Sequence, residues 1–108
     1  MDFEQLLKFV DVESKRLKKH YGEYPDKEKE ALAMAVKLQE ELGELCQEIL
    51  FHYSLQGKHK ADKFNKENLP NEFADVILIT LILAKKMNID IKKALSDKTK
   101  KIENRYRK

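Results

Sequence analysis

Apolar residues recur every three or four positions in four stretches of this chain, which is the spacing of one face of an α-helix. The predicted helices run over residues 2–20, from 26 to 55–57, from 69 or 70 to 87, and over 91–104. Only three glycines and two prolines occur in 108 residues, which leaves little material for the many turns of an all-β fold. The pattern therefore predicts an all-α, four-helix fold in a single domain spanning residues 1–108.

The breaks between these stretches hold the residue types that begin and end helices. Gly22 is expected to end the first helix, and Pro25 excludes its continuation. Asp26 and Asp90 are suited to N-cap the second and fourth helices. The link of residues 58–71 is polar and lysine-rich. It is long for a compact domain, which favours a functional role or mobility.

The third predicted helix is apolar in every direction, since residues 76–84 contain only Thr80 as a polar side chain. A helix of this kind is expected to be buried on all sides. A four-helix monomer of this length can hardly bury one helix so completely. We therefore expect a homo-oligomer with this helix at or near the interface. In the fourth helix, Ala94, Leu95 and Ile102 are expected to face inward.

Composition and charge narrow the class of protein. The net charge of +3 is mildly basic and does not by itself indicate nucleic acid. Residues 92–108 are more basic, with six lysines and two arginines against two acids. The single cysteine, Cys46, excludes an intrachain disulfide and is expected to be a small packing residue. No signal-peptide pattern or membrane-length apolar run is present, so we expect a cytoplasmic protein without a membrane partner.

Two clusters of carboxylates lie on consecutive predicted helices. The first follows one flank of the second helix beside its apolar stripe, around Gly43, a residue that would permit close approach of another backbone or a ligand. The second is a pair one turn apart at the head of the apolar third helix. The clusters comprise Glu40, Glu41, Glu44 and Glu48 on the second helix, and Glu72 and Asp75 on the third.

Like charges at this spacing repel, so two facing clusters would destabilise a helical bundle unless a cation bound between them. Oxygen-only ligands select hard cations, Mg²⁺ above all, with Mn²⁺ as a substitute. Such an ion commonly takes substrate phosphates as further ligands, and it can activate water and neutralise a leaving group. The simpler alternative is that a glutamate-rich helix is a solvated face, which fits the Glu72–Asp75 pair less well.

A di-iron bundle is the main rival for carboxylates on helices, and it requires Glu-x-x-His pairs. Here Glu44 is followed three residues later by Gln47, and Glu48 by Phe51, so we exclude iron. The three histidines fall outside the pattern and are expected at the surface or at helix ends. They are His20, His52 and His59.

The sequence Glu40-Glu41-x-x-Glu44, followed after 27 residues by Glu72-x-x-Asp75, resembles the motif of the MazG-type, all-α nucleotide pyrophosphohydrolases. The similarity extends through Met87–Leu95 to Lys100–Arg105 and covers roughly residues 30–106. The resemblance implies a helical domain that dimerises, often as paired dimers, and forms sites like those of a four-helix bundle. It also implies Mg²⁺-dependent hydrolysis of a nucleoside triphosphate to the monophosphate and pyrophosphate.

The same resemblance assigns roles to individual residues. It implies that four acids ligate metal and that the Glu-Glu-x-x-Glu acids are catalytic. It also implies that a C-terminal Lys-x-x-x-Asn-Arg contacts phosphate or sugar. This C-terminal segment could equally be a solvated helix end. Lys37 is expected to meet a phosphate or to pair with Glu41. The assignments are metal ligands Glu41, Glu44, Glu72 and Asp75; catalytic acids Glu40, Glu41 and Glu44; and substrate-binding residues Lys37, Lys100, Asn104 and Arg105.

Base selectivity does not follow from the resemblance. Some relatives place aromatic residues to stack on the base, whereas this chain has no Trp and carries Ile79 one turn after Asp75. Phosphoribosyl-ATP pyrophosphohydrolase activity remains an alternative within the same class. A non-catalytic helical dimerisation or regulatory module that binds a divalent cation is the alternative outside it. A nucleic-acid binder is disfavoured, because the chain lacks a recognised motif and its acids would repel phosphates.

Overall fold

The computed structural model describes residues 1–22, 24–53 and 68–107, and within these residues the fold consists of four helices without strands. The all-α prediction is therefore confirmed. Most of the link 58–71 lies outside the described residues, and its last four residues belong to a helix. The helices are α1 (Phe3–Tyr21), α2 (Lys27–His52), α4 (Asn68–Lys86) and α5 (Ile91–Asn104).

Local sequence signals set the helix boundaries. The Asp26 carboxylate accepts a hydrogen bond from the backbone N–H of Lys29 at 2.7 Å, and Asp90 accepts one from Lys93 at 3.0 Å, so both predicted N-caps are confirmed. α1 ends at Gly22, whose φ of +84° is a conformation that side-chain-bearing residues rarely adopt. A capping box between Asp2 and Gln5, which was not predicted from the sequence pattern, begins α1.

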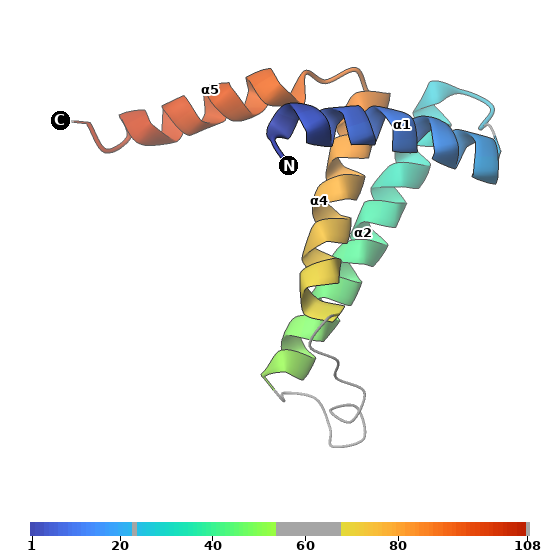
Figure 1. The fold of residues 1–108 in the computed structure, drawn as a ribbon, viewed down its shortest axis with the longest axis horizontal. Coiled ribbons are helices and arrows are strands. Elements are labelled where there is room, and N and C mark those ends of the chain that lie inside the picture. The colour runs from blue at the N-terminus through green and yellow to red at the C-terminus, as the bar shows by residue number, and fades with distance from the viewer. Residues whose placement is uncertain (23, 54–67, 108) are drawn as a thin grey trace.

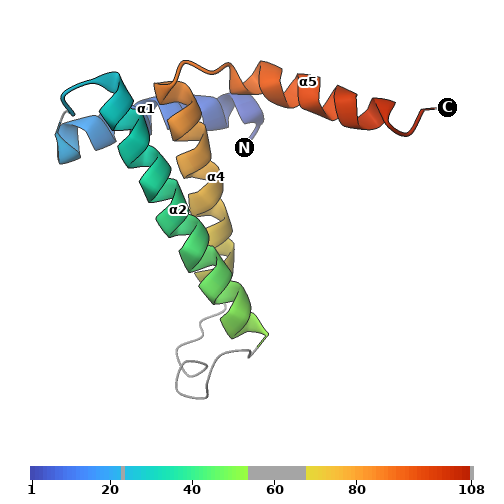
Figure 2. The same ribbon diagram turned by 180° about the vertical axis from the view of Figure 1, so that it is seen from behind.

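α4 is the central helix and contacts all three others (Figures 1 and 2). α2 runs antiparallel to it along most of its length, and α1 crosses the end of this pair that carries the C-terminus of α4. The hydrophobic core lies at that crossing. It is formed by buried Val10, Leu81 and Ile82, with partly buried Leu6, Leu17, Met34, Leu78 and Ile91 packed against them.

Ion pairs between helices stabilise the same end of the molecule. The Lys86 ammonium lies 2.7 Å from the Glu30 carboxylate, and the two side chains are only 8% and 17% exposed. Lys85 lies 3.0 Å from Asp11, joining α4 to α1. Each lysine donates a hydrogen bond that lowers the pKa of its partner carboxyl below the ordinary value.

Within one chain α4 is not buried on all sides, since Phe73 is 49% and Ile77 is 54% exposed, which fits the expectation that a single chain cannot bury this helix completely. Two other burial predictions are wrong for the single chain. Leu95 and Ile102 of α5 do not face a core, and α5 contains no buried residue. Cys46 is exposed rather than packed. Within one chain, the first half of α4 packs mainly against α2. The remaining apolar surface of this half is therefore exposed.

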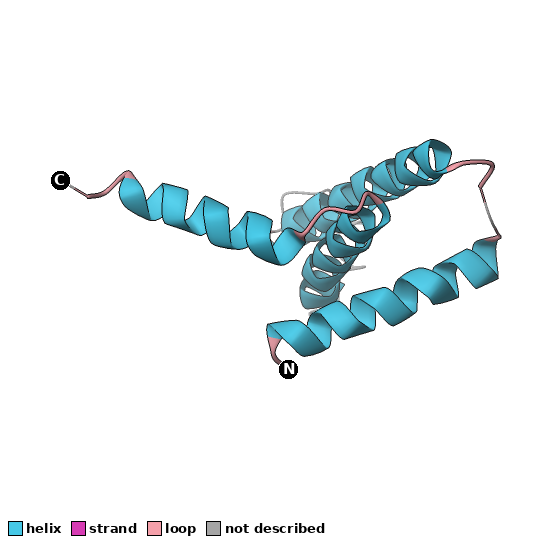
Figure 3. Cartoon of the chain, turned by 90° about the horizontal axis from the view of Figure 1, so that it is seen from above, coloured by secondary structure: helices cyan, strands magenta, loops and turns pink. Residues whose placement is uncertain are grey.

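The molecule is extended rather than compact. Its Cα radius of gyration is 17.1 Å, whereas a compact chain of this length has one of about 13 Å. α5 extends away from the other helices, as the view from above shows (Figure 3). A Cβ added at Gly43 would meet nothing from the rest of the described chain within 4 Å, so the close approach expected there does not occur within one chain. Among the described residues, no helix is long and apolar enough to span a membrane.

Candidate metal centre

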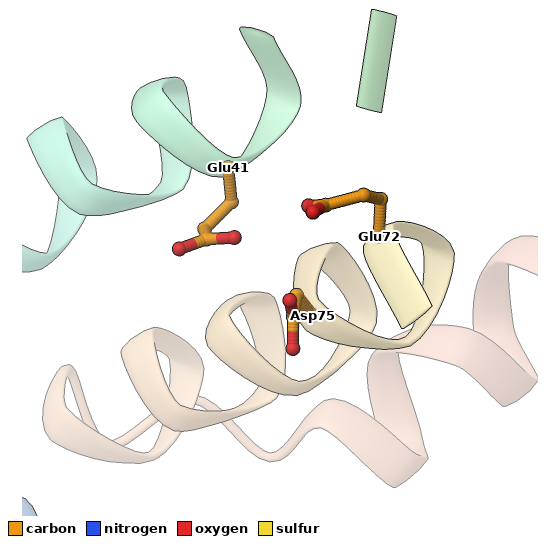
Figure 4. A group of neighbouring side chains, drawn as sticks. All are labelled: Glu41, Glu72 and Asp75. Atoms are coloured by element: carbon orange, nitrogen blue, oxygen red, sulfur yellow. The ribbon is translucent and has the colours of Figure 1, made fainter. Parts of the chain in front are cut away.

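Three carboxylates from two helices meet between α2 and α4. Glu41 projects from α2, and Glu72 and Asp75 project from the first turns of α4 into the same space (Figure 4). One carboxylate oxygen from each residue lies within 4.8 Å of the other two. The antiparallel pairing of α2 and α4 thus brings together the two acidic clusters that are separated in the sequence.

Glu72 is the least favourably placed of these acids electrostatically. Its Oε2 atom is buried and has no hydrogen-bond partner. Burial, reinforced by the negative charges of Glu44, Asp75, Glu41 and Glu48, raises the pKa of its carboxyl above the ordinary value. A bound cation would reverse both effects, because it would supply the missing partner and the missing positive charge.

Glu41 has a positive partner already. Its side chain is largely buried, and the Lys37 ammonium lies 3.3 Å from its Oε1 atom. Lys37 also lies 4.0 Å from Glu40. The hydrogen bond to Glu41 raises the pKa of Lys37, so this lysine stays protonated at neutral pH. Of the two expectations for Lys37, pairing with Glu41 is the one observed within the chain.

The other predicted acids lie around this group. Glu44 is exposed and outside the three-carboxylate group, although its charge has the largest effect of those acting on Glu72. Glu40 is exposed at the rim, as its outward position in the sequence pattern indicated. Glu48 points inward: its Oε2 atom is buried and unpartnered in the described part of the chain.

Two hollows each have an acid of the first cluster, Glu41 or Glu40, in their walls. One, of about 190 Å³, is lined by Glu41 and Asp75 together with Phe9 and Glu13 of α1. The other, of about 270 Å³, lies between the end of α1 and the first half of α2, with Lys37 and Glu40 in its wall. No sequence pattern indicated that α1 would border the site, because that depends on how α1 crosses the helix pair. The second hollow is also lined by Leu17, Tyr24, Met34, Val36 and Ile79.

The predicted phosphate-binding residues of α5 are not at this centre within one chain. About eleven residues of α4 separate Asp75 from Lys86, a helical rise of about 16 Å, and α5 begins only beyond that point. α5 then extends away from the pair (Figure 1). The residues concerned are Lys100, Asn104 and Arg105, all exposed.

The donor set suits a hard divalent cation. All three grouped residues offer carboxylate oxygens, which Mg²⁺ and Mn²⁺ prefer over softer metals. His20 and His52 are exposed, as expected, while His59 lies outside the described residues. A cation between the helices would supply the partner that the buried Oε2 atom of Glu72 lacks among the described residues.

Comparison with known proteins identifies a family. The family model of the MazG nucleotide pyrophosphohydrolase domain matches residues 29–108, from the first turn of α2 onward. It therefore includes all six acids of the two clusters. Neither a curated protein nor a solved structure matches the chain.

Proposed function

Because the chain belongs to the MazG nucleotide pyrophosphohydrolase family, we propose that it hydrolyses a nucleoside triphosphate to the monophosphate and pyrophosphate with Mg²⁺. The observation that carries the proposal is the convergence of Glu41, Glu72 and Asp75 between two helices, with one Glu72 oxygen buried and unpartnered. Carboxylates in this arrangement are costly unless they hold a cation. Mn²⁺ would substitute, since it accepts the same oxygen ligands.

When bound, the divalent ion would neutralise phosphate charge and lower the energy of the pyrophosphate leaving group. The chain supplies the remaining functions. Glu41, Glu72 and Asp75 hold the ion, and Glu44 completes the set from the exposed side. We assign the acceptance of a proton from the attacking water to Glu44 or Glu40, since both are exposed carboxylates of the first cluster.

Lys37 has a positioning role in this proposal. It is held by Glu41 at 3.3 Å and Glu40 at 4.0 Å, and it also lines the hollow of about 270 Å³. A triphosphate that spans the centre and this hollow would bring its negative charge against the Lys37 ammonium. The largely apolar lining of the hollow, which includes Met34, Val36 and Ile79, is suited to the nucleoside.

A homo-oligomer is part of the proposal. The extended shape of one chain, the exposed apolar side chains of α4 and the absence of any buried residue in α5 all favour a second copy packing on this surface. In such an assembly, α5 of one copy would bring Lys100, Asn104 and Arg105 to the carboxylates of the other. The basic helix and the acidic centre have complementary charge.

The decisive experiment is a substrate panel with detection of released pyrophosphate. Ribo- and deoxyribonucleoside triphosphates and phosphoribosyl-ATP are each incubated with the protein and Mg²⁺ or Mn²⁺. We expect pyrophosphate and not orthophosphate, and no product after chelation of the metal. The panel also identifies the base and sugar preference. Absence of pyrophosphate from every compound with every metal would refute the proposed activity.

The non-catalytic alternative predicts a different response to ligands. Exposed apolar side chains on α4 would also suit a module that binds another protein and uses the acids only to hold a cation. Melting temperature measured with Mg²⁺, with and without nucleotide, separates the two functions. Stabilisation by Mg²⁺ alone, with no further effect of nucleotide, favours the module; additional stabilisation by nucleotide favours the hydrolase.

A further inference from the structure

We propose that Asn88 is a positioning residue: the turn that it closes, together with α1, fixes the direction in which α5 leaves the helix pair. α5 then acts as a preset arm that presents its basic residues to the metal centre of a partner copy. This role deepens the proposed function and rests on it, because it concerns the residues expected to bind phosphate. In this role Asn88 does not contact the substrate and acts through α5.

The direction of α5 does not come from packing along its length. Ile91 is partly buried, whereas every later residue of α5 is exposed. The helix extends away from the other three (Figure 3). Its direction within one chain is therefore determined by its first turn and by the link of residues 87–90 that joins it to α4.

The link is a turn closed by hydrogen bonds. The Asn88 N–H donates to the Lys85 carbonyl at 3.0 Å, and the Ile89 N–H donates to the Ala84 carbonyl at 2.9 Å. This pair of bonds is the Schellman motif, which places a left-handed residue at the position of Asn88. Asn88 has a φ of +58°, a conformation that asparagine adopts more readily than most other side-chain-bearing residues. The residue after Ile89 is the N-cap of α5, so one capped turn joins the two helices.

α1 contacts the first turn of α5 in two places. Ile91 packs against the buried core, to which α1 contributes Val10. The ammonium of the next residue, Lys92, is paired with the carboxylate of Glu4 in the first turn of α1. Successive residues of a helix project about 100° apart, so the two contacts restrain α5 from two directions. Because an exposed ion pair adds little to stability, we expect the Lys92–Glu4 pair to affect mainly the direction of α5.

The length of α5 magnifies any error in its direction. Arg105 follows Ile91 by about 14 residues, a helical rise of about 21 Å. A tilt of about 20° at the link would therefore displace Arg105 by about 7 Å. Hydrogen bonds from a basic side chain to a phosphate need a separation of about 2.8 Å, so such a tilt would remove the phosphate contacts expected of Lys100, Asn104 and Arg105.

Pulsed electron paramagnetic resonance between spin labels on α1 and α5 measures the direction of α5. Exposed Lys8 and Lys98 are replaced by cysteine for labelling, and the exposed Cys46 is replaced by serine. Labelled protein is diluted with unlabelled protein, so that the distances are those within one chain. We expect one narrow distance distribution in the wild type. Asn88→Val should shift or broaden it, since a β-branched residue disfavours the left-handed conformation, whereas Asn88→Gly should retain it.

The kinetic consequence is measured with the nucleoside triphosphate that releases pyrophosphate fastest in the substrate panel. KM should rise at least about tenfold in Asn88→Val and less than about twofold in Asn88→Gly, because a displaced α5 loses its contacts with phosphate. Binding of Mn²⁺ without nucleotide should be unchanged in both variants, since the grouped carboxylates of α4 lie in its first turns, far from the link. A purely structural role would lower the melting temperature without this difference between substrate and metal binding.

A charge exchange tests the α1 contact without altering the turn. Glu4→Lys places two ammonium groups together, so it should shift the distance distribution and raise KM. The double variant Glu4→Lys/Lys92→Glu restores the pair and should restore both properties. Glu28→Lys, the same change of charge at an exposed glutamate of α2, is the matched control and should alter neither. A broad distribution in the wild type, or wild-type distances in both Asn88→Val and Glu4→Lys, overturns the positioning role.

The distance measurement contains no nucleotide, so its outcome is distinct from that of the substrate panel. If the protein releases pyrophosphate but Asn88→Val and Glu4→Lys keep the wild-type KM, the positioning role fails and the proposed function stands. If the distances respond as expected but no nucleotide is hydrolysed, the proposed function fails and the control of the direction of α5 by Asn88 and α1 stands.

Discussion

At the scale of single residues, the centre is defined by which carboxylates have a positive partner. Glu30 and Glu41 are paired with lysines, and Glu72 is not. A protein that buries an unpaired carboxylate gives up stability at that point, and such sites are commonly functional. Substitutions of the paired and unpaired acids should therefore have opposite effects on stability.

Asp75→Asn tests the unpaired group. Without metal, the substitution removes one of the negative charges acting on Glu72, so we expect the melting temperature to stay the same or to rise by about 2–4 °C. Hydrolysis should fall at least about a hundredfold, because a metal ligand is lost. Mg²⁺ should stabilise the wild type and not the variant. Unchanged turnover would show that the reaction takes place elsewhere.

Glu30→Gln tests the paired group. Lys86 is 8% exposed and would lose its carboxylate partner, so we expect a loss of about 2 kcal/mol at pH 7. The hydrogen bond from Lys86 lowers the pKa of Glu30 in the folded state. Its contribution is therefore fully present above the ordinary value of 4.5 and is lost as pH falls through the lowered pKa.

Urea unfolding at pH 7 and near pH 3 measures this difference. The destabilisation of Glu30→Gln relative to the wild type should shrink at the lower pH. Glu28→Gln, in the same first turns of α2 but exposed, is the control and should change stability by less than about 0.5 kcal/mol at either pH. An equal cost of Glu30→Gln at both pH values would contradict the assignment of the ion pair.

That the two acidic clusters face each other could be predicted because it follows from two local patterns, whereas the metal-binding role of the three grouped acids stays a prediction. Glu41 lies on the flank of an amphipathic helix, and Glu72 and Asp75 lie one turn apart at the head of an apolar one. The Glu30–Lys86 pair could not be predicted in the same way. Its members are 56 residues apart, and their contact depends on the register between α2 and α4.

At the scale of helices, capping residues and helix-ending residues determine the helix boundaries, and these boundaries could be predicted from the sequence. Asp26, Asp90 and Gly22 act as expected because capping depends on hydrogen bonds within one turn. The burial of each helix face was less predictable. Periodicity shows which face is apolar, but not whether this chain or another covers it, and Ile77 and Leu95 are uncovered within one chain.

Gly43→Ala tests an interior helix position. A Cβ at residue 43 meets nothing within 4 Å, and alanine is the better helix former by about 1 kcal/mol, so we expect a higher melting temperature and unchanged hydrolysis. Gly22→Ala is the contrasting control: its φ of +84° makes alanine strained there, and the melting temperature should fall. A folded Gly43→Ala protein without activity would show that a ligand or another copy approaches α2 at this point.

At the scale of the whole molecule, the structure of one chain leaves apolar surface and a basic helix without cover. Ile77→Asp places a charge on the exposed face of α4, where it should prevent a second copy from packing. Sedimentation velocity should show a wild-type oligomer and a variant shifted toward the monomer, with retained helical circular dichroism. A wild type that sediments as a monomer at all concentrations would exclude the proposed assembly.

Mixing two inactive variants tests whether α5 acts between copies. Asp75→Asn damages the carboxylate centre, and the double variant Lys100→Ala/Arg105→Ala damages the basic helix. If each site combines the centre of one copy with α5 of its partner, a mixed dimer contains one undamaged site and one doubly damaged site. Random exchange of subunits makes half of the dimers mixed, so activity should recover to about a quarter of the wild-type value.

An arrangement within one chain gives the opposite result. Each copy would then carry its own damage, and a mixture of the two variants would be no more active than their average. The intrachain geometry argues against that arrangement, because the length of α4 separates Asp75 from the start of α5 and α5 extends away from the centre. Recovery of activity on mixing would therefore explain why a helix with no buried residue carries the basic residues of the site.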